Sequence, residues 1–135
     1  MRKQKGFTLI ELLVVIAIIG LLSTLAVVAL NNARMKSRDA KRVSDIKQVQ
    51  TAVELYYNDV NAYPSSITGS IASGGVTYMA SVPTNPEPVD TGCTGATYNY
   101  VSASPYSTYT ITYCLGGSTG SIAAGWHTAY PGSIQ

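Results

Sequence analysis

The chain has 135 residues, enough for one small domain and one long additional segment. Nine Lys and Arg residues against seven Asp and Glu give a net charge of +2, and all nine basic residues lie at or before Lys47. Because phosphate contacts need Lys or Arg, nucleic-acid binding is not expected of the C-terminal part of the chain.

Residues 1–6 form a short basic segment that precedes a long apolar run. An ordinary secretory signal peptide is one interpretation, with a cut after Ala29. Two features oppose it, since the run exceeds the usual length of about 7–15 residues and carries a carboxylate, Glu11, near its start. We therefore expect the run to be kept. The basic segment should stay cytoplasmic, which places the C-terminal part across the membrane.

Residues 7–30 are predicted to form a membrane-spanning helix, because only four of their side chains are polar. At about 1.5 Å per residue this helix is about 36 Å long, more than the hydrocarbon thickness of about 30 Å. A carboxylate near the centre of a membrane helix costs about 2.5–3.5 kcal/mol, so Glu11 requires a reason. No proline interrupts the run, and we predict that the helix of an isolated subunit is unbroken through residues 20–29.

Residues 31–58 are predicted to continue the helix in amphipathic form, from about Thr8 to Asn58 in all. Apolar side chains recur at three- and four-residue steps and form one stripe: Ala40, Val43, Ile46, Val49, Val53 and Tyr56. Basic side chains occupy much of the remaining surface: Arg34, Lys36, Arg38, Lys41, Arg42 and Lys47. The simplest interpretation of these cations is a solvated helix face.

Residues 59–135 are rich in Gly, Pro and Ser and are predicted to form a β-rich head, with strands at 76–79, 98–101 and 109–115. Tyrosines alternate with polar residues in the last two, as in a sheet with one covered face. The fold class is therefore α+β, with a small antiparallel sheet covering the helix stripe. We interpret the ten tyrosines as half-buried strand residues with the ring inside and the hydroxyl outside, rather than as a carbohydrate-binding surface.

Two cysteines, Cys93 and Cys114, lie in this head. Outside the cytoplasm disulfides persist, so a bridge is preferred to two buried free thiols. A bridge that closes a loop of this size contributes about 3 kcal/mol.

The sequence assembles no active site, so no enzyme activity, catalytic residue or cofactor is predicted. His127 is the only histidine, and no Cys-His pairing suggests zinc. Glu87 and Asp90 supply too few oxygen ligands for a calcium site to be favoured. Without a Gly-rich phosphate loop that carries a lysine, the chain does not power its own assembly, and a separate ATPase must do so.

The string Lys5-Gly6-Phe7-Thr8-Leu9-Ile10-Glu11-Leu12-Leu13 resembles the class III signal of type IV pilins and related pseudopilins. The resemblance implies that a membrane peptidase removes residues 1–6 by cutting after Gly6, and that the same enzyme methylates Phe7. It also implies that the helices of mature subunits pack in a filament core. There we expect Glu11 to pair with the Phe7 amine, preferably that of a neighbouring subunit, because such a pair fixes register.

The predicted function is that of a prepilin, the structural subunit of an extracellular type IV pilus-like filament. Its partners would be identical subunits, the peptidase, an inner-membrane assembly platform with its ATPase, and membrane lipid before assembly. The precursor would lie in the cytoplasmic membrane with its head outside the cytoplasm. One alternative is a minor pilin or a pseudopilin of a type II secretion or competence system. Another is a single-pass membrane-anchored binding module.

Three details refine this resemblance. Val28 stands where relatives commonly carry a proline, so we expect any helix melting in the filament to be shorter than in those relatives. Asn85 stands where many pseudopilins have Asp, which disfavours a major secretion pseudopilin. The basic side chains of residues 31–58 are expected to touch lipid headgroups and then to meet acidic groups of neighbouring subunits: Glu54, Asp59, Glu87 or Asp90.

Overall fold

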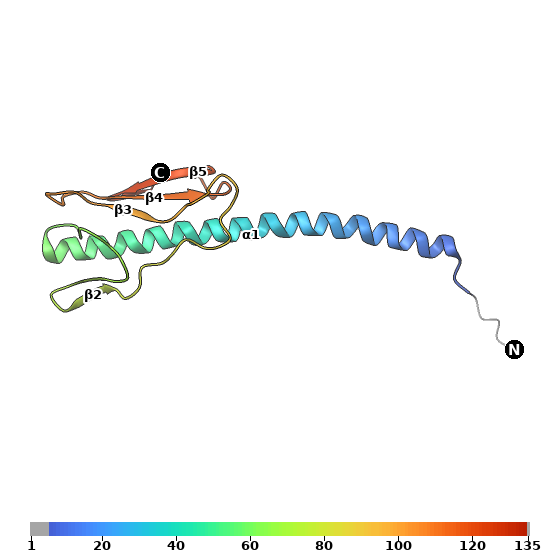
Figure 1. The fold of residues 1–135 in the computed structure, drawn as a ribbon, viewed down its shortest axis with the longest axis horizontal. Coiled ribbons are helices and arrows are strands. Elements are labelled where there is room, and N and C mark those ends of the chain that lie inside the picture. The colour runs from blue at the N-terminus through green and yellow to red at the C-terminus, as the bar shows by residue number, and fades with distance from the viewer. Residues whose placement is uncertain (1–5, 135) are drawn as a thin grey trace. The chain divides into compact units, whose positions relative to one another are not determined.

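The computed structural model describes residues 6–134, and within them it contains one long helix followed by six strands (Figure 1). Of the predicted leader, residues 1–5 lie outside the described part of the chain. The chain divides into two compact units, Met1–Arg34 and Met35–Gln135, which are described separately.

Helix α1 spans Leu9–Val60 without a break, which confirms the predicted continuous helix, including residues 20–29. The two hydroxyl groups in its apolar N-terminal part are satisfied inside the helix. The Oγ of Ser23 donates to the carbonyl of Ile19 at 2.7 Å, and the Oγ1 of Thr24 donates to that of Leu21 at 2.8 Å. The apolar N-terminal part of α1 is long enough to cross a membrane by length and composition.

The strands form two antiparallel sheets. The first pairs β1 (Ile71–Ser73) with β2 (Val76–Met79). The second has the order β3-β4-β5-β6 and contains Asn99–Val101, Thr110–Leu115, Gly125–Tyr130 and Ser133–Ile134. The predicted strands are confirmed as β2, β3 and β4. The other three were not predicted, because β1 and β6 are only three and two residues long and β5 does not alternate regularly between apolar and polar residues.

The head core lies between the C-terminal half of α1 and β4, with the larger sheet beside this half in Figure 1. Many of the fully buried side chains come from these two elements: Ile46, Val49 and Val53 from α1, and Ile111, Tyr113 and Leu115 from β4. Each such aliphatic side chain contributes about 1.5–3 kcal/mol by leaving water. The predicted stripe is wrong at one end, because Ala40 is exposed.

The prediction that tyrosine hydroxyls point into solvent is wrong for the tyrosines that face α1. The hydroxyl of Tyr98 donates to Asp45 at 3.0 Å. Those of Tyr63 and Tyr109 both donate to Glu54, at 3.0 and 3.3 Å. The reason is that α1 turns these carboxylates toward the head, where they are stronger hydrogen-bond acceptors than neutral groups.

Candidate processing and assembly site

The N-terminal end of α1 is closed by a reciprocal cap between Thr8 and Glu11. The backbone N–H and the hydroxyl of Thr8 both donate to Oε2 of Glu11 at 2.7 Å. The N–H of Glu11 in turn donates to Oγ1 of Thr8 at 3.3 Å. This arrangement is a capping box, in which a residue before the helix and one in its first turn satisfy each other's backbone donors.

Sequence reasoning missed Thr8, although its spacing to Glu11, Thr-x-x-Glu before an apolar run, is the pattern of a capping box. The cap gives Glu11 a partner within its own chain. A carboxylate with such a partner is less costly in an apolar environment than a bare one. Any pairing of Glu11 with another subunit must therefore compete with Thr8.

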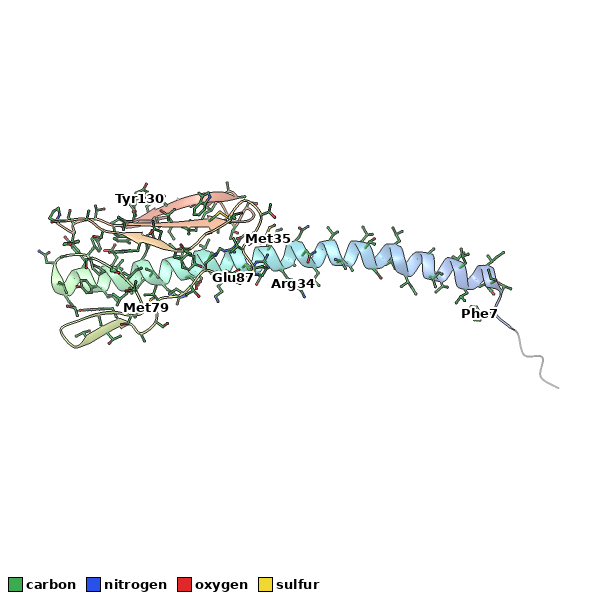
Figure 2. The ribbon with its side chains drawn as sticks, viewed as in Figure 1. Phe7, Arg34, Met35, Met79, Glu87 and Tyr130 are labelled. Atoms are coloured by element: carbon green, nitrogen blue, oxygen red, sulfur yellow. A yellow bond between two sulfur atoms is a disulfide. The ribbon has the colours of Figure 1, made fainter. Side chains whose placement is uncertain are left out.

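Gly6 and Phe7, the predicted cleavage and methylation residues, both lie outside the helix and are exposed. Figure 2 shows Phe7 beside the N-terminal end of α1. The Phe7 side chain is 83 % exposed. A Cβ atom added at Gly6 would meet no heavy atom within 4 Å. The fold of this chain therefore does not require glycine at position 6, and a need for glycine there would come from the enzyme that cuts the chain.

A buried charged cluster joins α1 to the loop before β3. We call it the ion cluster, and it consists of Arg38, Asp39, Arg42 and Asp90. Arg42 is 0 % exposed, and its Nη1 donates to Asp39 and to Asp90 at 2.6 Å each. Its Nε donates to Oδ1 of Asn85 at 2.8 Å, and its Nη2 donates to the carbonyl of Pro86 at 3.2 Å. This guanidinium is thus satisfied by four acceptors, as a buried charge requires.

The acidic members of the ion cluster are equally well satisfied. Asp39 accepts the backbone N–H groups of Gly116 and Gly117 at 3.0 and 2.8 Å. Asp90 accepts from Arg38 as well as from Arg42. Burial alone would raise the pKa of Asp90, but the hydrogen bonds and charges of the two arginines outweigh burial and hold that pKa below its ordinary value.

Glycine is needed next to this cluster for steric reasons. A Cβ atom at Gly116 would lie 2.4 Å from the Cβ of Asp90, closer than real side chains approach. The backbone after β4 can therefore reach Asp39 only because position 116 has no side chain.

The ion cluster corrects two expectations. Arg38 and Arg42 do not belong to a solvated face, because Asp90 and Asp39 pair with them inside the subunit. Asp90 is consequently neither a free acidic partner for a neighbouring subunit nor a carboxylate with uncompensated charge for calcium. Local sequence pattern did not reveal this, since Arg42 and Asp90 are 48 positions apart.

The predicted disulfide between Cys93 and Cys114 is present, with Cα atoms 5.6 Å apart and both residues buried. It joins the loop before β3 to β4, two positions before Gly116. Disulfide and ion cluster together attach the same loop to β4 and to α1. The loop is thereby fixed although it contains no strand.

Comparisons with known proteins agree with the N-terminal motif. A family model described as the prokaryotic N-terminal methylation motif matches residues 1–27. The type IV wide pilus major component of Thermus thermophilus is 35 % identical over 133 residues, which is 97 % of this chain and 85 % of that protein.

Type II secretion system core protein G of Vibrio cholerae is 39 % identical over 88 residues, or 65 % of this chain and 56 % of that protein. The same component of Aeromonas hydrophila is 43 % identical over 68 residues, 50 % of this chain and 48 % of that protein. The chain thus spans about half the length of these secretion-system relatives. No solved structure matches the chain. The N-terminal motif, the long helix with its β-rich head and the nearly full-length likeness to a pilus component show that the chain belongs to the type IV pilin and pseudopilin family.

Proposed function

We propose that this chain is a structural pilin whose precursor is cut after Gly6, methylated at Phe7 and assembled into a type IV pilus-like filament. The observation that carries the proposal is the alignment of 97 % of the chain with a pilus major component. A pseudopilin of a secretion system is the second candidate, favoured by identities of 39–43 % with core protein G over about half of that protein.

In this proposal residues 1–6 are the removed leader, 7–30 the membrane span and later the filament core, 31–58 the amphipathic helix and 59–135 the head. The apolar side chains of α1 before Leu30 are largely exposed in the single chain and need an apolar environment. Both bilayer and filament core supply one, so transfer changes little hydrophobic free energy. Close packing and polar pairing must therefore favour the filament.

Glu11 supplies that polar pairing by exchanging partners. In the single chain it caps its own helix through Thr8. Cleavage after Gly6 creates an α-amino group at Phe7, and Glu11 of one subunit then binds this cation on a neighbour. A charge-assisted bond replaces bonds to neutral donors, which favours assembly over the free subunit. The peptidase, an assembly platform and a separate ATPase act on the chain from outside.

The proposal predicts different defects for two single substitutions. Gly6→Leu should leave an uncut precursor, and Glu11→Gln should be cut normally but yield few filaments. Ser23→Ala is the matched control in the same span, because Ser23 bonds only within its helix, and it should assemble normally. N-terminal mass spectrometry measures cleavage, and electron microscopy of sheared surface filaments measures assembly.

The pilin proposal fails if the mature chain begins at Met1 or after Ala29, or if Glu11→Gln gives a normal filament yield. Mass spectrometry of the filaments separates the two candidate functions. A pilin should be the main component of long filaments on ordinary cells. A pseudopilin should be absent from them, and its loss should block secretion instead.

A further inference from the structure

A groove of about 630 Å³ lies between α1 and the hairpin that β5 and β6 form at the end of the head. Its lining comes from α1 between Lys47 and Leu55 and from residues 132–134. The side-chain amide of Gln50 donates to the carbonyls of Tyr130 and Ser133, at 2.8 and 3.1 Å. These bonds attach the hairpin to the helix beside the groove.

The groove offers an exposed cation with no direct ion pair, beside an apolar wall. Lys47 is exposed, and none of the ion pairs within residues 6–134 includes it. Glu54, the acidic residue in the lining, already accepts the hydroxyls of Tyr63 and Tyr109. Leu55 is 49 % exposed and forms the apolar wall. A fitting occupant combines a carboxylate with adjoining apolar groups.

The head carries such a segment elsewhere on its surface, at Glu87 and Pro88. Both residues are exposed, and a half-buried Val89 follows them. Glu87 uses one carboxylate oxygen, Oε2, to accept the N–H of Val89 at 3.1 Å. Its other oxygen has no partner within the described residues, whereas both oxygens of Asp90 are bound by arginines.

Segment and groove lie on different sides of α1 and cannot meet within one subunit. The carbonyl of Pro86 accepts a hydrogen bond from Arg42, so the next residue, Glu87, lies at the surface close to Arg42, beside α1 (Figure 2). Lys47 follows five residues later, about 140° around the helix and about 7.5 Å along it. A contact between two different patches is heterologous, and repeating it without ring closure builds an open helical filament.

We infer that Glu87 and Pro88 of one subunit seat in the Lys47 groove of the next subunit. The inference rests on the proposed filament function and names a contact between its heads. The free carboxylate oxygen of Glu87 complements the exposed ammonium group of Lys47. The exposed ring of Pro88 complements the apolar wall at Leu55.

The other exposed carboxylate of the head, Asp59, suits the groove less well. Its Oδ2 accepts the hydroxyl of Tyr78 at 2.7 Å, and no proline adjoins it in the sequence. Glu87 is therefore the acidic partner that its free oxygen and the adjoining Pro88 favour.

Paired cysteines in the full-length chain test the contact, in cells that assemble filaments. Filaments of Lys47→Cys/Glu87→Cys should give a ladder of dimers, trimers and higher multimers after mild oxidation, because every subunit carries both halves. Each single-cysteine variant should give dimers at most. Lys41→Cys/Glu87→Cys is the matched control, since Lys41 is also an exposed lysine of α1 but lies outside the groove, and it should not form a ladder.

Charge exchange provides a second measurement. An exposed ion pair is worth up to about 1 kcal/mol, so Lys47→Glu or Glu87→Lys should raise the subunit level needed for filaments by up to about fivefold. The double exchange Lys47→Glu/Glu87→Lys should restore it. Three results would each overturn this inference: cysteine-pair filaments that yield only unlinked monomers, a Lys47→Cys adduct with a different protein, or no rescue by the double exchange. None of these results would contradict the proposed filament function. Absence of filaments from the unaltered chain would instead refute the proposed function.

Discussion

Removal of the Arg42 side chain should strongly destabilise the head. Replacement by Met keeps a long side chain in place but deletes four hydrogen bonds and leaves Asp39 and Asp90 buried with less compensation. Removing one partner from a buried ion pair costs about 3–5 kcal/mol. Against a total stability of about 5–15 kcal/mol this is a large fraction. At about 4 °C or more per kcal/mol, the Tm should fall by at least about 12 °C.

Thermal unfolding of the full chain in detergent micelles, followed by near-ultraviolet circular dichroism of the tyrosines, measures this loss. Arg38→Met is the matched control, because Arg38 pairs with the same Asp90 but its side chain is 20 % exposed. Solvent screening limits its contribution to about 1 kcal/mol or less. Equal and small losses for Arg42→Met and Arg38→Met would refute the reasoning that burial makes the ion cluster stabilising.

Three further predictions concern the same head. The pKa of Asp90 is held below its ordinary value, so the stability that the Asp90 carboxylate contributes is present above about pH 4 and is lost as pH falls through the lowered pKa. Urea unfolding at decreasing pH should show this loss of stability, and the loss should be smaller in Arg42→Met. Burial, and next the hydrogen bond to Glu54, raise the pKa of Tyr63 to about 12, so stability should decline as pH rises above about 10, and ultraviolet titration should show Tyr63 ionising only as the head unfolds. Gly116→Ala should cost about 1–3 kcal/mol by crowding Asp90, whereas Gly20→Ala meets no heavy atom within 4 Å and should cost nothing in the same denaturation assay.

Local pattern in the sequence was sufficient for α1 and for three strands, and the inferred compartment outside the cytoplasm was sufficient to predict the disulfide. The apolar run is long, and the stripe that follows it repeats over several helical turns, so many residues support the same prediction of a helix. The absence of proline between Gly20 and Ala29 was enough to predict an unbroken helix there. The Lys-Gly-Phe-Thr-Leu-Ile-Glu string likewise identified the family without any structure.

Tertiary structure decided which polar side chains are surface and which are core. Arg42 and Lys47 are both cations of one amphipathic helix, yet one is 0 % exposed and the other lies open in a groove. The difference depends on Asp90, which is 48 positions away from Arg42 and reaches it only because the loop before β3 returns to α1. Helix periodicity predicts the face of the helix on which a residue lies. It does not predict which group covers that face, because the covering group comes from a segment distant in the chain. Burial of a charge depends on such partners, and only the folded head brings them together.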